Sequence, residues 1–276
     1  MASVSPYARR FISYLRREQI KRLAASKNRV DGRALDQTRE IEIKTGVVKT
    51  ADGSAEVKLG KTHVIAGVKV GLGQPFPDAP DEGVLVVSAE VLPHASPYTE
   101  VGPPDESAIE LARVVDRGIR HCGYVDFKKL AVEGGKAYVL WVDLYVINDD
   151  GNLVDAANLA SVAALKNTQL PAVVKDESGA VKLDRNNKSP LPLETSKVPV
   201  AVSVGKIANV LFLDPNFEEE LSLDGRVTFT ISEDRIVAAQ KTLGYFTQPE
   251  LEAALDLAIK GRDRYLEALK SILGSS

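Results

Sequence analysis

The sequence predicts an α+β protein with two related halves, in which mixed β-sheets pack against helices. Strand hairpins followed by helices occur twice along the chain, which is the segregated pattern typical of this class. With 276 residues the chain is long for one compact domain and fits two modest domains that share an interface. Its 44% hydrophobic and 26% charged residues are ordinary globular values, which exclude a wholly disordered chain.

Apolar runs and turn signals define the elements of the first half. Residues 55–59 and 63–68 flank Gly60-Lys61 and are typical of a β-hairpin. The prolines and acids from Pro103 onward open a helix that continues to about Arg120, and the run 153–167, rich in Ala and Leu, predicts a second helix. The predicted strands are 41–43, 55–59, 63–68, 84–87 and 137–147.

The second half repeats strands followed by a helix. Residues 175–197 are rich in Lys, Asp, Asn and Pro and predict a surface connection with a weak hairpin. Four short strands follow, and the turn Ser232–Arg235 joins the last two. Apolar residues at helical spacing predict a final helix over about 249–273. The predicted strands are 198–204, 210–213, 226–231 and 236–239.

The distribution of charge marks a separate N-terminal segment. Residues 1–30 contain eight basic side chains and one acid, and therefore have a charge of +7. Apolar residues at roughly helical spacing predict an amphipathic helix that either docks on the body or on a neighbouring subunit, or binds a polyanion. They are Phe11, Leu15 and Leu23, with Tyr14 and Ile20 nearby. We expect a basic helix at 1–30, a first domain at 31–170, a connection at 171–197 and a second domain at 198–276.

Composition limits the class of protein. Lys and Arg total 35 against 38 Asp and Glu, and a net charge of −3 argues against a generic nucleic-acid coat protein. No apolar run reaches membrane-helix length, and the first residues lack the apolar core of a secretory signal. The single Cys122 and three scattered histidines indicate no disulfide and no metal site. We therefore expect a cytoplasmic protein with no membrane contact, no cofactor and no metal.

Two further patterns resemble binding motifs only superficially. Gly71-Leu72-Gly73 is followed by prolines rather than by the helix that a phosphate-binding turn requires. Asp214 with Glu218–Glu220 is acidic enough for a metal site, but a solvated charge run after Pro215 is the favoured interpretation.

The predicted helix through Arg120 has a basic face. Helical geometry places Arg113, Arg117 and Arg120 on one side, where their like charges favour an anionic partner. Local pairing is the alternative, because Glu110 can reach Arg113 and Asp116 can reach Arg120. The planar guanidinium group suits phosphate recognition.

Several linked motifs make the chain resemble the RNase PH family, and within it the archaeal exosome ring subunit that lacks its own active site. The resemblance covers about residues 10–270, and its motifs are Val30–Arg33, Ala51–Gly60, Gly102–Pro104, Glu110–Arg117, Trp141–Asp143 and Gly151–Ala157. It implies two RNase PH-type subdomains in a hexameric ring that contains three copies each of two related subunits. It also implies partners: a catalytic RNase PH-type subunit, RNA, and RNA-binding cap proteins.

The chain departs from the active members of this family at the positions that perform phosphorolysis. Those members have a Gly-(Ser/Thr)-Arg segment that holds the attacking phosphate, whereas this chain has Gly151-Asn152-Leu153. They also have two aspartates six residues apart, and the matching positions here are Leu191 and Lys197. Neither side chain can act as a catalytic acid or bind a cation. The resemblance therefore implies a subunit with no catalytic residues.

The resemblance assigns RNA positioning to the basic face. It implies that Arg113 and Arg117 bind RNA and complete a composite site with the catalytic partner. The expected function is that of a non-catalytic exosome component in 3′-to-5′ RNA degradation. Two alternatives stay open: an active phosphorolytic exoribonuclease of this family, because Asp184 lies near the mismatched positions, and a stand-alone RNA-binding scaffold.

Overall fold

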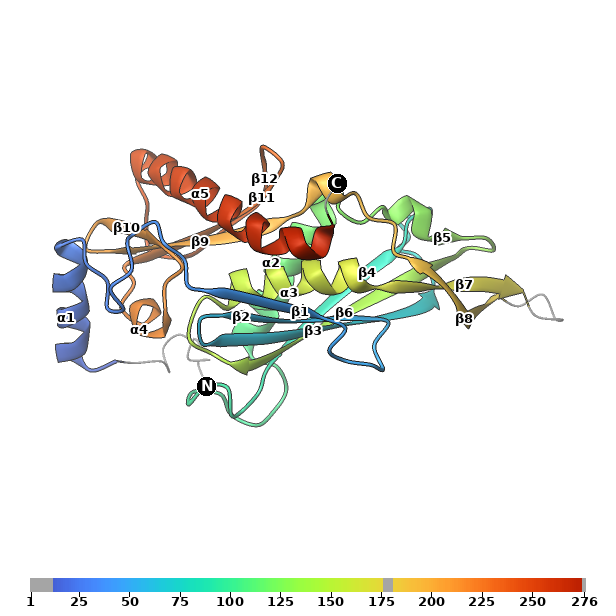
Figure 1. Ribbon diagram of the computed structural model, residues 1–276, viewed down its shortest axis with the longest axis horizontal. Helices are drawn as coiled ribbons and strands as arrows, with labels where there is room; N and C mark the ends of the chain where they lie inside the picture. The colour runs from blue at the N-terminus through green and yellow to red at the C-terminus, as the bar shows by residue number, and fades with distance from the viewer. Residues whose placement is uncertain (1–11, 176–180, 275–276) are drawn as a thin grey trace.

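The computed structural model describes residues 12–175 and 181–274. The molecule is elongated, with helix α1 (Tyr14–Ala25) at one end and the hairpin of β7 (Gln169–Lys175) and β8 (Val181–Pro190) at the other (Figure 1). Two larger sheets lie between these ends, so the fold is α+β with two halves, as the sequence predicts.

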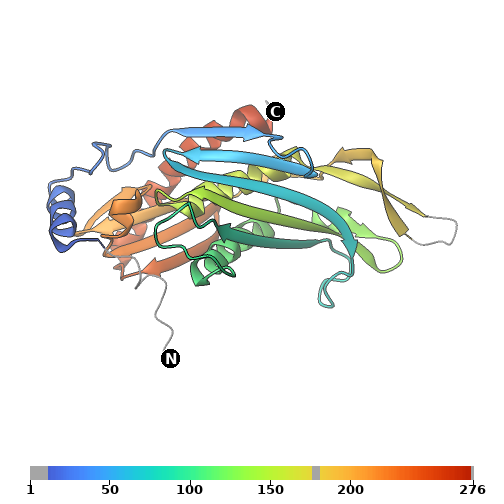
Figure 2. The same cartoon turned by 90° about the horizontal axis from the view of Figure 1, so that it is seen from below.

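The first sheet has the strand order β1-β2-β3-β6-β4, and β5 pairs with β6. Its strands are β1 (Ile41–Thr45), β2 (Gly53–Leu59), β3 (Thr62–Gly73), β4 (Val84–Val91), β5 (Ala131–Val132) and β6 (Lys136–Asn148). Only β4 runs parallel to its neighbour, because helix α2 (Glu106–Cys122) lies in the crossover between β4 and β6. Figure 2 shows this sheet on the near side of the molecule, with the helices behind it.

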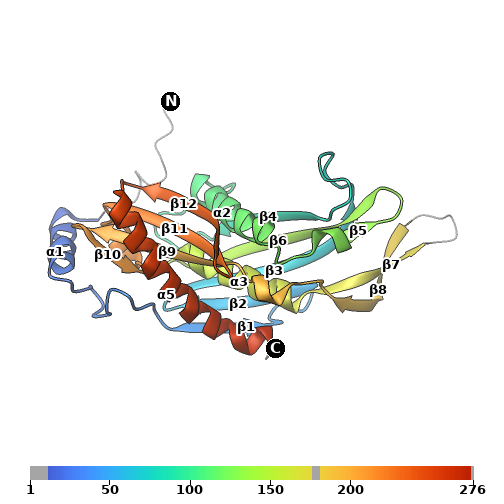
Figure 3. The same ribbon diagram turned by 90° about the horizontal axis from the view of Figure 1, so that it is seen from above.

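The second sheet is antiparallel, with the order β10-β9-β11-β12. Its strands are β9 (Val200–Ile207), β10 (Val210–Leu213), β11 (Gly225–Ser232) and β12 (Arg235–Leu243), and its helices are α4 (Phe217–Glu220) and α5 (Gln248–Leu273). Short 3₁₀ turns cover Phe127–Leu130 and Thr195–Lys197. Figure 3 shows α5 on the opposite side of the molecule from the first sheet.

Helix α3 (Leu153–Asn167) joins the two halves. Residues Val154–Leu165 are all buried, and the helix contacts strands of both sheets. Because β10 pairs only with residues 204–207 of β9, the earlier N–H groups on that edge need other acceptors. Asn158 Oδ1 accepts from Ala201 N at 2.8 Å, and Asp155 Oδ2 accepts from Ser203 N at 3.0 Å. Side chains of α3 thus continue the ladder where β10 has ended.

Most predicted elements are confirmed. The hairpin at Gly60, the long strand over 137–147 and the helix over 153–167 correspond to β2–β3, β6 and α3. The hairpin predicted in 175–197 is longer than expected, because its first strand begins at Gln169.

Only part of the predicted apolar stripe of the N-terminal helix docks on the body of this chain. Tyr14 and Leu15 are exposed in the single chain, where docking on a neighbouring subunit stays a prediction, and Phe11 lies outside the described residues. The second half of α1 does dock on the body, since Ile20 and Ala24 pack in a cluster with residues of the second half of the chain. Basic residues contribute through ion pairs such as Arg16–Glu218 at 2.6 Å. Ion pairing within the chain therefore neutralises part of the positive charge that would otherwise be available to a polyanion.

None of the helices in residues 12–175 and 181–274 is long and apolar enough to cross a membrane.

Close contact between β2 and α3 makes a glycine necessary at position 53. A Cβ atom there would lie 2.2 Å from Thr168 Oγ1 and 2.7 Å from Ala164 O. We expect Gly53→Ala to lower the free energy of unfolding by about 3 kcal/mol, because the end of α3 must move away. Gly67→Ala on β3 is the control, since nothing lies within 4 Å of its added Cβ. Thermal denaturation of both variants checks this, and equal melting temperatures would contradict the close packing.

Candidate functional site

Helix α2 holds the arginines that the sequence predicted as a binding face. It begins after Asp105, whose side chain accepts from Ala108 N at 2.9 Å, and it ends at Gly123 in the left-handed conformation. Its buried residues pack inward, and Arg113 and Arg117 lie along the outer side. The capped, packed helix therefore holds both guanidinium groups on a rigid support.

The three arginines of this face have different surroundings. Arg120 pairs with Asp116 at 2.6 Å and donates to Leu85 O at 2.8 Å, which confirms local pairing for this residue. Arg117 is half-buried and makes one long contact, 3.4 Å, to Gln240 Oε1. Arg113 is exposed and has no hydrogen bond or ion pair among the described residues. Arg113 and most donors of Arg117 are therefore available to an anion.

The predicted pairing of Glu110 with Arg113 is wrong. Glu110 Oε1 instead accepts from Gln240 Nε2 at 3.0 Å and Thr242 Oγ1 at 3.3 Å, both on β12. The two arginines border a surface hollow of about 410 Å³. Its lining residues are Val87, Ala112, Arg113, Asp116, Arg117, Arg120 and His121.

The loop before α3 is built into the junction of the two halves. Gly151 has φ +81°, and a Cβ there would lie 2.6 Å from the backbone of Asn216, so only glycine fits. Asn152 is fully buried with φ 56°, a conformation that asparagine tolerates. Its N–H donates to Glu220 Oε1 at 2.9 Å, and Arg226 donates to the same oxygen at 2.7 Å. The Glu220 carboxylate thus accepts the hydrogen bond of the Asn152 N–H group, which lies just before the start of α3.

The positions matched to the catalytic aspartates have no acidic group. Leu191 is buried in the main core, and Lys197 is half-buried near Gly123. Asp184 lies on β8 opposite Ala172, where its carboxylate accepts from Asn186 N at 2.9 Å. It therefore belongs to the β7–β8 hairpin, whereas residues 191–197 run beside the end of α2.

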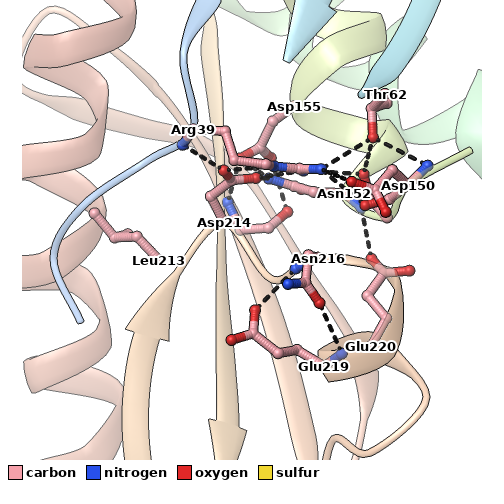
Figure 4. A network of polar contacts seen from close by, with 12 residues as sticks. Arg39, Thr62, Asp150, Asn152, Asp155, Leu213, Asp214, Asn216, Glu219 and Glu220 are labelled. Carbon is pink, nitrogen blue, oxygen red and sulfur yellow. Dashed lines mark hydrogen bonds and ion pairs between the residues drawn. The ribbon is translucent and has the colours of Figure 1, made fainter. Parts of the chain in front are cut away.

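The interpretation of the acidic run at 214–220 as a solvated surface is wrong. Asp214 is 0% exposed and Glu219 is 2% exposed. Asp214 binds Arg39 through both oxygens, at 2.9 Å and 2.7 Å (Figure 4). It also accepts from Arg33 at 2.9 Å. Glu219 pairs with Arg29 at 2.5 Å. The metal alternative has no support either, because no three metal-ligating side chains are grouped within the described ranges.

This buried network was missed because its partners are far apart in sequence. Arg39 and Asp214 are separated by 175 positions, and no local periodicity links them. Asn152 also donates to Asp214 and Asp155, so the network reaches the start of α3. One signal in the sequence points to this buried network. Three arginines lie just before the first strand, at Arg29, Arg33 and Arg39.

Burial and ion pairing act in opposite directions on the two central carboxyls. Burial alone would raise the pKa of Asp214, but the hydrogen bonds and charges of Arg39 and Arg33 outweigh it and hold the pKa below its usual range. Burial raises the pKa of Asp155 to about 7, although Asn152 and Ser203 donate hydrogen bonds to the carboxylate. Asp155 therefore titrates near neutrality inside the domain junction.

The raised pKa of Asp155 predicts a pH-dependent contribution to stability. The folded state binds this proton more tightly than the unfolded state, so the stability it supplies is present at low pH. It is lost as the pH rises from about 4 to the folded pKa of about 7. The difference in unfolding free energy between the natural protein and Asp155→Asn should fall by up to about 1.4 kcal/mol per pH unit. Denaturant titrations across this range measure it; a constant difference would contradict the shifted pKa.

Comparison with known sequences identifies the family. Two models described as "3′ exoribonuclease family" match the chain, domain 1 at residues 37–171 and domain 2 at residues 197–261. An exosome complex component Rrp42 of Pyrobaculum aerophilum is 85% identical over 273 residues, covering 99% of this chain and 100% of that protein. The protein of the same name from Thermococcus onnurineus is 46% identical and covers 92% of this chain and 95% of that protein.

Solved structures agree with these sequence matches. A chain of the Archaeoglobus fulgidus exosome with RNA bound to the active site superimposes with a TM-score of 0.84 at 41% identity, covering 93% of this chain and 98% of that chain. Rice Rrp46 has a TM-score of 0.67 at 19% identity, covering 89% of this chain and 100% of that chain, which shows a shared fold. From these matches and from the two domains found in the right order, the chain belongs to the RNase PH family.

Proposed function

We propose that this chain is a non-catalytic ring subunit of an archaeal exosome and acts in 3′-to-5′ RNA degradation with a catalytic RNase PH-type partner. Relatives that match nearly the whole chain have the name exosome complex component Rrp42, which supports this function. The observation that bears most directly on the absence of catalysis is the loop at Asn152.

The loop at Gly151-Asn152-Leu153 lacks the means to bind an attacking phosphate. The Asn152 N–H is bonded to the Glu220 carboxylate, and a second anion at that point would be repelled by it. Leu153 stands where an arginine would be needed, and Arg226, which lines the same hollow as Leu153, pairs with Glu220 at 2.7 Å. A phosphorolytic enzyme needs a cradle for phosphate, and here the chain's own acid fills that place.

The acid pair of phosphorolysis is also missing from the matching positions. Leu191 is buried among apolar side chains and Lys197 is cationic. Asp184, the acid that would favour an active enzyme, lies on the β7–β8 hairpin. These features support a subunit that depends on its partner for chemistry.

RNA positioning is the role that we propose for Arg113 and Arg117. Both belong to a rigid helix and border the same hollow, and Arg113 has no internal partner among the described residues. Guanidinium groups placed in this way bind phosphates and hold the register of a strand without reading its sequence. We propose that they complete a site whose catalytic residues come from the partner subunit.

The assembly that follows from this function is a cytoplasmic hexameric ring with three copies of each subunit and with RNA-binding cap proteins. We propose with it a chain divided into four parts: a basic helix, a first domain, a connection and a second domain, at 1–30, 31–170, 171–197 and 198–276. Family matches over 37–171 and 197–261 support the positions of the two larger parts.

The absence of catalysis predicts a clear result for the isolated chain. Incubated with labelled single-stranded RNA and inorganic phosphate, the chain should release no nucleoside diphosphate, because the phosphate cradle and acid pair are missing. Adding the catalytic RNase PH-type partner should give phosphate-dependent shortening from the 3′ end. Phosphorolysis by the chain alone, at a rate like that of the complex, would overturn the proposal.

The role of the arginine face is tested by reversing its charge. We expect Arg113→Glu with Arg117→Glu to slow RNA degradation by the assembled complex about 10-fold or more, since two phosphate contacts become repulsive. Ring assembly, followed by size-exclusion chromatography with light scattering, should be unchanged. Arg264→Glu, an exposed arginine on α5, is the matched control. Normal degradation by the double variant in an intact ring would show that the arginines have no part in RNA binding.

A further inference from the structure

A cluster of cations surrounds one buried carboxylate at the edge of the first sheet. The pairing of β2 with β3 ends at Gly53 and Val68, so the backbone of Val70 has no strand partner on that side. Asp52 Oδ2 accepts from Val70 N at 3.0 Å, and an Arg185 Nη atom donates to Val70 O at 3.2 Å. Arg185 also binds Asp52 at 2.9 Å. This pair closes the sheet edge and fixes the place of the arginine.

The cluster has an excess of positive charge. Lys188 lies 3.5 Å and Lys69 lies 3.7 Å from Asp52, in addition to Arg185. Three cations around one carboxylate leave two positive charges in excess, in a chain whose net charge is −3. The side chain of Asp52 is 3% exposed, whereas those of the cations are 37% to 50% exposed. The positive groups face solvent and repel one another, which an anionic ligand would relieve.

The carboxylate at the centre of the cluster is ionised. Burial alone would raise the pKa of Asp52, but the hydrogen bonds from Val70 and Arg185 and the charge of Lys69 lower it. Its one negative charge is shared among the backbone N–H of Val70 and the charged nitrogens of the three cations. The outer side of the cluster keeps the excess positive charge.

The tryptophan of β6 lies beside this cluster. Trp141 is the cross-strand partner of Lys69, and its six-membered ring lies over Gly71, where an added Cβ would be 2.6 Å from Cζ3. The residue is 38% exposed, which is high for an aromatic ring at the centre of a sheet. Gly71 thus leaves room for the indole on the outer face of the sheet, one strand away from the edge that carries the cations.

An exposed aromatic ring next to clustered cations matches the chemistry of single-stranded nucleic acid. Bases stack on aromatic rings, and the phosphates on either side bind cations, without any need for a particular sequence. A protein partner would more commonly meet an interface core depleted of charge. Asp143 lies farther along β6 on the same face and accepts from Ser88 at 2.6 Å, so an anionic strand would lie toward β3 and the β8 side.

We infer that Trp141, Lys69, Arg185 and Lys188 form a second contact for single-stranded RNA, in which a base stacks on the indole and the cations bind the flanking phosphates. The choice of RNA as the polynucleotide rests on the proposed function. The site is separate from the arginine face. Trp141 and Val86 share one face of the sheet, whereas Val87, which lines the hollow at Arg113, faces the other way.

The chain contains one tryptophan, so its fluorescence reports on this site alone. We expect a single-stranded oligoribonucleotide of about 10 nucleotides to quench the emission of the full-length chain to saturation. A duplex of the same sequence should quench little, because its bases are already stacked. The apparent affinity should fall with rising salt, as binding to phosphates requires.

Substitutions separate this site from the rest of the surface. Lys69→Gln with Lys188→Gln should weaken binding about 10-fold and reduce its salt dependence, and it leaves Arg185 to close the sheet edge. Lys260→Gln with Lys270→Gln on α5 is the matched control and should bind normally. With labelled RNA and anisotropy as the readout, Trp141→Ala should weaken binding about 10-fold, and Trp141→Phe should restore most of it.

The outcomes distinguish this inference from the proposed function. Quenching that persists in the Arg113→Glu, Arg117→Glu chain supports the second contact, whatever that variant does to degradation. Absence of quenching, or equal quenching in the Lys69→Gln, Lys188→Gln chain, overturns it. A blue shift of the Trp141 emission when the second ring subunit is added, with loss of quenching by RNA, also overturns it, because the face would then be a subunit interface.

Discussion

The buried Asp214 carboxylate, through its ion pairs and hydrogen bonds, connects the segment before β1, the start of α3 and the end of β10. One side chain with 0% exposure binds Arg33 and Arg39 from the segment before β1, and Asn152 from the start of α3. Loss of one partner from such a buried pair costs about 3–5 kcal/mol, since the remaining charge is left in a medium of low polarity. This ionised and paired carboxylate therefore helps to fix the N-terminal segment, the junction helix and the second sheet relative to one another.

The same junction is the main structural support for our proposal that this chain is non-catalytic. Glu220 reaches the Asn152 N–H from the second half of the chain, and Arg226 balances its charge. The N–H group of Asn152, which could otherwise bind an external anion, is thereby part of a contact between the two halves. In the proposed function, chemistry is left to a partner subunit, and Arg113 and Arg117 on α2 hold the RNA.

At two sheet edges, polar side chains make the backbone hydrogen bonds that a neighbouring strand would otherwise make. Asp155 and Asn158 bond the free edge of β9, and Asp52 with Arg185 bonds the free edge of β3. In each place a backbone group would otherwise be buried without a partner. The first device holds the two halves together. The second gathers cations at the surface, so a structural need of the sheet edge produces the charge that we assign to RNA.

The sequence by itself determined the elements and the arginine face, because both depend on spacing within one segment. Apolar periodicity predicted α3 and β6, and helical spacing placed Arg113 and Arg117 together on α2. It failed for the acidic run, whose burial depends on distant parts of the chain. Only the tertiary structure brought Arg39 to Asp214 across 175 positions and Lys188 to Lys69 around Asp52. Pairing of charges acts through space, and a linear pattern records only neighbours along the chain.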